Sequence, residues 1–189
     1  RLMAFAWRAG VIAFALVGRH IALWRPENAE GRLAAATETV RLAEQAGDKE
    51  LALTGHAWRV LDLLELGDIP AVDREIEAYA RLADDLRQPR YLWQAPMWRA
   101  MRALLEGRFE EADRSYRQAL ALKPDFSAAH SNLIFAMDLA EGHDLKAQQA
   151  ERRRWHEQHG RKCAAEIQPH ENSPDPKRTL RVGYVSADF

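Results

Sequence analysis

The sequence predicts an all-α solenoid, in which antiparallel helix pairs stack side by side. Three observations support this fold: the chain matches itself at a shift of forty residues, apolar residues recur at helical spacing on both sides of a glycine, and 47% of the 189 residues are hydrophobic. A single helix pair cannot bury its own apolar face, so neighbouring pairs must share one core. We therefore expect about eight helices in four pairs.

The self-match brackets two glycines, Gly67 and Gly107, each of which separates two amphipathic segments. Glycine suits a tight turn at these points because it adopts positive φ without a steric penalty. Pro70 then stands in the first turn of the following helix, where its missing N–H is not needed. The other matching pairs are Trp58 and Trp98, Arg59 and Arg99, Leu64 and Leu104, Asp73 and Asp113, and Arg74 and Arg114.

The first helix pair is expected at about 1–47. Its first helix ends near Trp24, and its second begins after the turn Pro26-Glu27-Asn28. Gly47 stands where a glycine commonly caps the C-terminus of a helix.

The remaining pairs are expected at about 49–86, 90–123 and 126–160. Ala83 to Arg90 reads as a longer polar connection between the second and third pairs. In the fourth pair, Ala128 to Ala140 is one helix and Leu145 to about Gly160 is the other. The turn between them is predicted at Gly142-His143-Asp144.

The segment from Trp93 to Phe126 resembles a 34-residue tetratricopeptide unit. Ala100 and Ala112 would let its two helices approach closely, while Phe109 and Tyr116 would fill the groove between units. Upstream, the forty-residue period resembles the longer helical repeats attached to bacterial signal-transduction ATPases and transcription regulators. The seven residues at signature tetratricopeptide positions are Ala100, Gly107, Phe109, Ala112, Tyr116, Ala119 and Pro124.

The chain changes character after Ile167. Residues 161–178 are predicted to be a linker, extended and exposed over Gln168 to Arg178, where three prolines interrupt any apolar period. Leu180 to Ser186 alternates as a β-strand would. A lone strand has no partner to pair with, so we expect 179–189 to be the first strand of a further domain that this chain does not contain.

Residues 125–189 resemble the passage from repeats to catalytic domain in bacterial SPINDLY-like O-linked N-acetylglucosamine transferases. That resemblance implies transfer of N-acetylglucosamine from UDP-GlcNAc to serine or threonine hydroxyls of proteins. The family's UDP-binding residues and its histidine would lie beyond this chain, which therefore carries no catalytic, cofactor-binding or metal-binding residue of its own. The stretches that carry the resemblance are His130 to Leu133, Gln149 to Trp155, Pro169-His170, Asp175-Pro176 and Arg181 to Phe189.

Five residues are candidates for binding a peptide along the concave face. The resemblance places Asn132 where related transferases hold a peptide backbone, although a capping or structural hydrogen bond is the alternative. Trp58 with Arg59 and Trp98 with Arg99 would form an aromatic and cationic strip of the kind that anchors partners. The alternative, which we favour for the tryptophans, is a place in the core between stacked helices.

Charge and cysteine content exclude several classes. Twenty-seven basic against twenty-eight acidic residues give a net charge of −1, which argues against a nucleic-acid partner. The longest uncharged apolar run, Ala9 to Gly18, is too short to span a membrane. Cys163 is the single cysteine and cannot form an internal disulfide, so we expect a cytoplasmic protein. His156 and His159 are interpreted as a solvated pair, because no third metal ligand is evident.

The sequence therefore predicts a protein-interaction superhelix, the substrate-recruiting part of a bacterial O-GlcNAc transferase-like enzyme. Two alternatives remain open: an interaction module of a signal-transduction ATPase or transcription regulator, and a non-catalytic scaffold.

Overall fold

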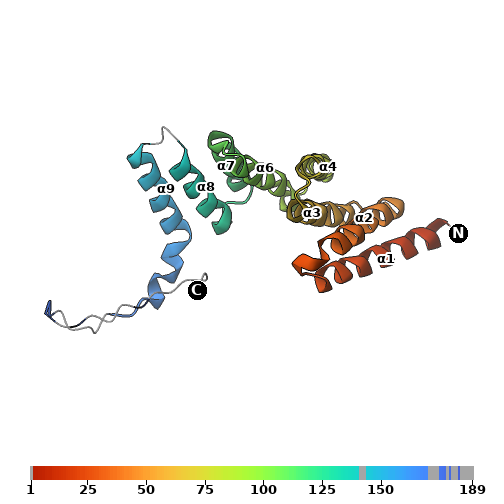
Figure 1. Ribbon diagram of the computed structural model, residues 1–189, viewed down its shortest axis with the longest axis horizontal. Coiled ribbons are helices and arrows are strands. Elements are labelled where there is room, and N and C mark those ends of the chain that lie inside the picture. Colours follow the sequence, from red (N-terminus) through yellow and green to blue (C-terminus); the bar gives the residue numbers. More distant parts are fainter. Residues whose placement is uncertain (1, 141–143, 170–174, 178, 180–182, 184–189) are drawn as a thin grey trace.

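The computed structural model is all-helical, as predicted. It describes residues 2–140, 144–169, 175–177, 179 and 183. This part of the chain contains nine α-helices, two 3-10 helices and no strand. The helices follow one another in space in chain order, with α1 at one end of an elongated molecule and α9 near the other (Figure 1).

The elements run as follows in chain order: α1 Leu2–Ala22, η1 Pro26–Asn28, α2 Ala29–Ala46, α3 Lys49–Leu66, α4 Ile69–Leu86, α5 Pro89–Leu92, α6 Gln94–Leu105, α7 Phe109–Leu122, α8 Ser127–Leu139, α9 Leu145–Gln158 and η2 Gly160–Glu166. Each long helix packs mainly against its neighbours in sequence. None of the helices in the described ranges is long and apolar enough to cross a membrane.

Glycine followed by aspartate ends one helix and begins the next. Gly47 and Gly67 have φ values of 71° and 75°, as the sequence predicted for C-terminal caps. The aspartates Asp48 and Asp68 then accept hydrogen bonds from the backbone N–H groups of Leu51 and Ala71. The side chain thus satisfies an N–H that the first turn of a helix leaves unpaired.

The forty-residue self-match coincides with matching burial. Val60 and Ala100, for example, are both fully buried, each seven residues before the glycine of its turn. Where one copy has a large side chain, the other often has alanine. The other equivalent buried positions are Leu63 and Ala103, Val72 and Ala112, Ile76 and Tyr116, and Tyr79 and Ala119.

Gly55 brings α3 close to α2. A Cβ at this position would lie 2.6 Å from Cγ2 of Val40 and 3.2 Å from the carbonyl oxygen of Ala36. Glycine is therefore required by a close helix approach and not by backbone conformation.

A buried charge cluster joins α1, α2 and α3. His20 Nε2 lies 2.7 Å from Asp62 Oδ2, and Arg32 Nε lies 3.4 Å from Asp62 Oδ1. All three side chains are at most 1% exposed. Arg32 also pairs with Glu65 at the edge of the cluster. Burial raises the pKa of Asp62, while His20 and Arg32 oppose that rise.

Two connections differ from the sequence prediction. Ala83 to Arg90 is not a polar connection, because α4 continues to Leu86 and buries Ala83 on its inner face. The connection is reduced to Arg87, at a φ of 52°, and Gln88, followed by the one-turn helix α5. This extra helix raises the count above the eight expected. The predicted linker 161–178 begins in the 3-10 helix η2, so its first residues are exposed but not extended.

Several predicted features fall outside the described residues. The turn at Gly142-His143, most of the linker after Pro169, and the predicted strand Leu180 to Ser186 apart from Gly183 are among them. Gln168 and Pro169 are exposed and without regular structure.

Substituting Gly55→Ala should lower the free energy of unfolding by about 1–3 kcal/mol, since the added methyl group overpacks the α2–α3 contact. Gly31→Ala is the matched control, because a Cβ on Gly31 in α2 meets nothing within 4 Å. That control should instead gain roughly 0.5–1 kcal/mol. Urea unfolding followed by circular dichroism measures both, and equal effects of the same sign would contradict the close approach.

Asp62→Ala should lower the free energy of unfolding by about 3–5 kcal/mol, because it removes the buried carboxylate that pairs with His20 and leaves buried Arg32 with Glu65 alone. Asp84→Ala, an exposed position on α4, serves as the control and should change it by no more than about 0.5 kcal/mol. Thermal and urea unfolding measure the free energy of unfolding of both variants. Similar small losses of stability in the two would show that the buried cluster is not a stabilising contact.

Candidate functional site

An aromatic groove lies where α3 and α4 meet α5 and α6. Its volume is about 350 Å³. Three tryptophans and two tyrosines supply its rings. Trp58 and Trp98 occupy equivalent positions in the forty-residue self-match, and Tyr91 belongs to the one-turn helix α5. The lining residues are Leu53, Thr54, Ala57, Trp58, Leu61, Tyr79, Tyr91, Trp93, Gln94 and Trp98. We refer to this set as the aromatic groove.

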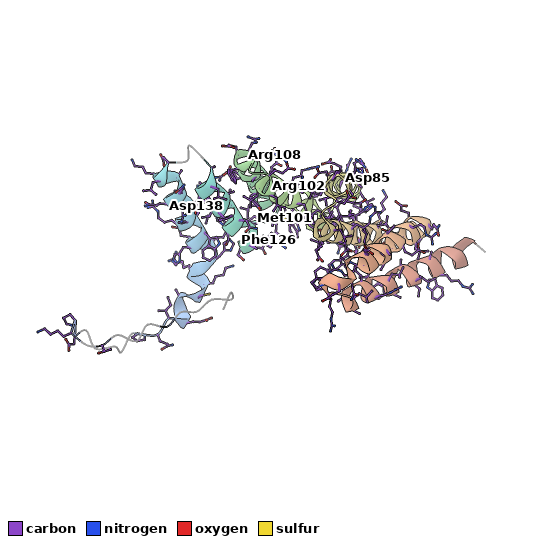
Figure 2. The ribbon with its side chains drawn as sticks, in the orientation of Figure 1. Asp85, Met101, Arg102, Arg108, Phe126 and Asp138 are labelled. Carbon is purple, nitrogen blue, oxygen red and sulfur yellow. The ribbon has the colours of Figure 1, made fainter. Side chains whose placement is uncertain are left out.

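The groove exists because α4 and α6 pack over a shorter stretch than the helices within either pair. A salt bridge holds this junction on one side, where Arg102 Nε of α6 lies 2.9 Å from Asp73 Oδ1 of α4. Arg102 is labelled in Figure 2 and is only 4% exposed. On the groove side, Trp98 meets Tyr79 edge to face at a centroid distance of 4.8 Å. Such a geometry is favoured by the opposite charges of ring face and ring edge.

Two groove residues carry polar atoms without a partner. Trp58 Nε1 and the Tyr79 hydroxyl are buried, and neither has a hydrogen-bond partner among the described residues. Burial, and then the Glu50 carboxylate, raise the pKa of the neighbouring Tyr91 hydroxyl. Burial raises the pKa of Tyr79 far above its ordinary value, so its hydroxyl keeps its proton as a donor. An unmet buried donor costs about 1–3 kcal/mol.

The aromatic groove contains no formally charged side chain. Charged residues at its edge are paired with each other or with rings: Arg90 Nη2 lies 2.5 Å from Glu50 Oε1. Lys123 Nζ lies 4.2 Å from the Trp93 ring centroid, within range of a cation–π interaction. The groove is therefore a neutral, apolar surface between paired charges.

The wall of the groove that Trp58 forms is backed by α1. The Trp58 ring lies 4.6 Å from the His20 ring and 5.5 Å from the Trp24 ring, measured between centroids. His20 is the residue that pairs with Asp62 in the buried cluster. The position of this wall thus depends on the charge cluster of the first three helices.

The two candidate arginines do not line the groove. Arg59 Nη2 lies 2.7 Å from Glu75 Oε1, and His56 Nδ1 lies 2.7 Å from the other oxygen of that carboxylate. Arg99 Nη2 lies 2.7 Å from Glu77 Oε1. Each arginine is therefore paired with an acidic residue of α4.

Asn132 lies elsewhere, on α8, where it is half-buried. Burial raises the pKa of Tyr116 of α7, and Asn132 opposes that rise. Of the five sequence candidates, the structure brings Trp58 and Trp98 into one groove and places Asn132 and the two arginines outside it.

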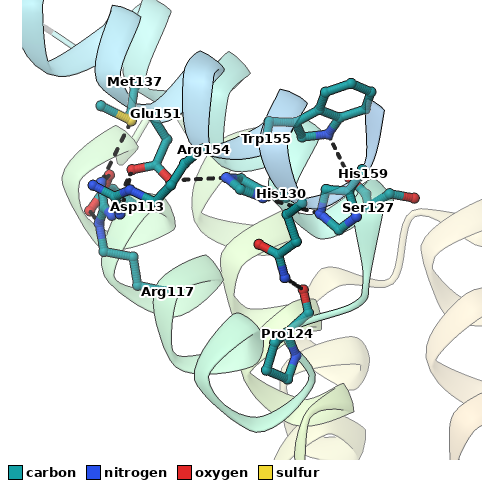
Figure 3. Close-up of polar contacts among 11 residues, drawn as sticks. Asp113, Arg117, Pro124, Ser127, His130, Met137, Glu151, Arg154, Trp155 and His159 are labelled. Carbon is teal, nitrogen blue, oxygen red and sulfur yellow. Dashed lines mark hydrogen bonds and ion pairs between the residues drawn. The ribbon is translucent and has the colours of Figure 1, made fainter. Parts of the chain in front are cut away.

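A second polar cluster joins α7, α8 and α9 (Figure 3). Glu151 of α9 is 4% exposed, yet its carboxylate meets three cationic or polar side chains. His130 Nε2 lies 2.9 Å from Glu151 Oε1, while Arg117 Nη1 and Arg154 Nη1 lie 3.2 and 3.3 Å from Oε2. This network fully pairs the buried carboxylate, as a buried charge requires.

His130 also faces His159, with its Nδ1 3.2 Å from His159 Nε2. The direction of this hydrogen bond follows from the tautomers of the two rings. Burial, and then the neighbouring His130, lower the pKa of His159. His159 is half-buried and faces His130, whereas His156, the other member of the expected solvated pair, is exposed.

No group of three or more His, Cys, Asp or Glu side chains that could hold a metal ion occurs in the described part of the chain. The cluster around Glu151 is best explained as the contact that holds α9 onto α7 and α8.

The sequence interpretation missed Tyr79, Tyr91 and Trp93 as groove residues. Tyr79 lies within the second predicted helix pair, and Tyr91 directly follows Ala83 to Arg90, the predicted polar connection. A usable signal was the concentration of aromatic residues from Tyr91 to Trp98.

Comparison with known proteins identifies no relative: no family model matches the chain, and no match is found among curated proteins or solved structures.

The His159 pKa should lie below 6.5 in the folded protein and should rise part of the way back in His130→Gln, since burial remains the larger cause. The unfolded chain then binds the proton more readily, so stability should fall as the pH drops from about 6.5 through the lower folded value. Titration of the imidazole signals by NMR, with the urea-unfolded chain as reference, measures this. A folded pKa at or above the unfolded one would contradict the assignment.

Proposed function

We propose that this chain is a protein-interaction module of tandem helical hairpins that binds a peptide segment in the aromatic groove. The single observation that carries the proposal is the meeting of Trp58 and Trp98, from matching positions of two helix pairs, in one neutral groove. Aromatic anchors in partly enclosed pockets supply most of the binding energy of typical interfaces.

The unpaired donors support the same conclusion. A groove that only completed the core would have no need of polar atoms without partners, whereas a peptide backbone offers carbonyl oxygens that can accept from them. The Asp62 cluster also contains buried polar atoms without a hydrogen-bond partner, His20 Nδ1, Arg32 Nε and Asp62 Oδ1, but its side chains form ion pairs with one another, whereas Trp58 and Tyr79 carry no charge.

We further propose that the hairpins are of the tetratricopeptide type, as the resemblance of Trp93 to Phe126 implies. Three features of the structure are compatible with this: Ala100 and Ala112 are fully buried between α6 and α7, and Tyr116 is 1% exposed in the same cluster. Small residues at such points allow close helix packing.

The full protein, on this proposal, is a cytoplasmic bacterial enzyme of the O-GlcNAc transferase-like class, and this chain recruits its protein substrates. The support is the resemblance of residues 125–189, and the UDP-GlcNAc donor would bind outside this chain. The two alternatives, an interaction module of a signalling regulator and a non-catalytic scaffold, would use the same groove. They differ from the transferase in the domain to which this chain is attached. Sequencing the complete reading frame separates them: two nucleotide-sugar-binding lobes after Phe189 support the transferase, and their absence overturns it.

Trp98→Ala should weaken binding of groove ligands at least tenfold, because it removes a central aromatic anchor. The ligands are peptides selected from a displayed library of random uncharged sequences, with affinity measured by calorimetry. Trp7→Ala, on the exposed side of α1, is the control and should bind as the unmodified chain does.

Gln94→Ala keeps all the rings and changes one polar group of the lining, so it tests the same groove without a large cavity. Circular dichroism establishes that each variant is folded. Selected peptides that bind Trp98→Ala and Gln94→Ala at full affinity would place their site elsewhere and overturn the proposal.

A further inference from the structure

We infer that the ligand of the aromatic groove is a proline-rich segment in the polyproline II conformation. This inference rests on the proposed function and narrows it to one chemical class of peptide. Three properties of the groove lead to it: the kind of polar atom left unpaired, the absence of charge, and the arrangement of rings.

The unpaired polar atoms call for acceptors. The Trp58 indole N–H can only donate, and the protonated Tyr79 hydroxyl is a donor without an acceptor near it. Both atoms are covered by neighbouring side chains, so the inference requires the half-buried Trp58 and Trp98 side chains to shift when a ligand carbonyl binds. The cost of the unmet donors in the unliganded protein is recovered when that carbonyl arrives.

The need for free carbonyl acceptors in the ligand distinguishes among the known modes of peptide recognition. A bound α-helix uses its carbonyl oxygens internally and offers few acceptors. An added β-strand needs a sheet edge, and the described residues form none. A polyproline II segment has no internal hydrogen bonds and keeps its carbonyl groups available. Proline also brings no backbone N–H that would need an acceptor in the groove.

The absence of charged side chains from the lining argues against a charged ligand. No Asp, Glu, Lys, Arg or His lines the aromatic groove, whereas the pocket beside α9 is lined by Arg117, His130, Glu151 and Arg154. A phosphorylated or strongly basic peptide would lose hydration on entering this groove without gaining a partner. The groove therefore matches an uncharged segment.

The rings supply flat surfaces for pyrrolidine rings. Trp98 stands edge to face on Tyr79, and Trp93 stands edge to face on Phe126 with centroids 4.9 Å apart, so each ring packs on an aromatic neighbour. Aromatic-lined grooves bind proline-rich segments because the ligand is already extended and loses little entropy. With about 3.1 Å rise per residue, one polyproline II turn of three residues spans about 9 Å.

The test titrates the full chain with two capped, uncharged synthetic peptides: one that contains a run of six prolines, and one with alanine at those six positions. Calorimetry gives the affinities, and NMR follows the indole N–H signal of Trp58, assigned with Trp58→Phe. We expect the proline peptide to bind at least tenfold more tightly and to shift that signal.

Tyr79→Phe removes the unpaired hydroxyl and keeps the ring, so it should weaken the proline peptide about three- to tenfold without unfolding the protein. Tyr116→Phe is the matched control, because Tyr116 is buried to the same extent as Tyr79 but lies on α7, outside the aromatic groove, and it should leave the affinity within about twofold.

The outcomes distinguish the two proposals. Equal binding of both peptides, lost in Trp98→Ala, would overturn the proline inference and leave the peptide-binding function standing. Proline binding that neither Trp98→Ala nor Tyr79→Phe weakens would overturn the inference by placing the site elsewhere. No binding of either peptide, together with a random library that yields no groove ligand, would overturn both.

Discussion

The buried carboxylate of Asp62 is the contact on which the first half of the molecule depends. It pairs with His20 of α1 and Arg32 of α2 while itself belonging to α3, so it can be satisfied only when three helices lie in one register. Removing a charge from water is costly and is offset only by well-placed partners. Because the His20 ring also packs on Trp58, this register sets one wall of the aromatic groove.

Small and large side chains then decide where the helices close and where they stay apart. Gly55 allows α3 to press against α2, and Ala100, Ala103 and Ala112 do the same for α6 and α7. Between α4 and α6 the contact is shorter, and the large rings of Tyr79 and Trp98 bridge it. A groove arises at this point because rings cannot interdigitate as tightly as alanines do.

Charged and uncharged polar groups occupy different parts of the molecule and have different roles. Near both ends of the helical array, buried carboxylates are paired with histidine and arginine, and these clusters hold helices together. The aromatic groove between them has rings, unpaired donors and no formal charge. This contrast favours a neutral ligand for the groove and a structural role for the charged clusters, including the His130–His159 pair.

The sequence by itself determined the helical class, the glycine caps at Gly47 and Gly67 and the equivalence of Trp58 with Trp98, because these depend on local backbone preference and on periodicity along one helix. It predicted the end of the second pair at about residue 86, where α4 ends, but it did not reveal α5. Its interpretation of Ala83 to Arg90 as a polar connection was wrong, since a polar, charged stretch can be helical when one face carries a buried residue such as Ala83. Only the tertiary structure decided which rings share the groove and which carboxylates meet His20, His56 and His130. Those contacts join residues 19 to 42 positions apart, and they depend on how helices cross, which the period of a single helix does not specify.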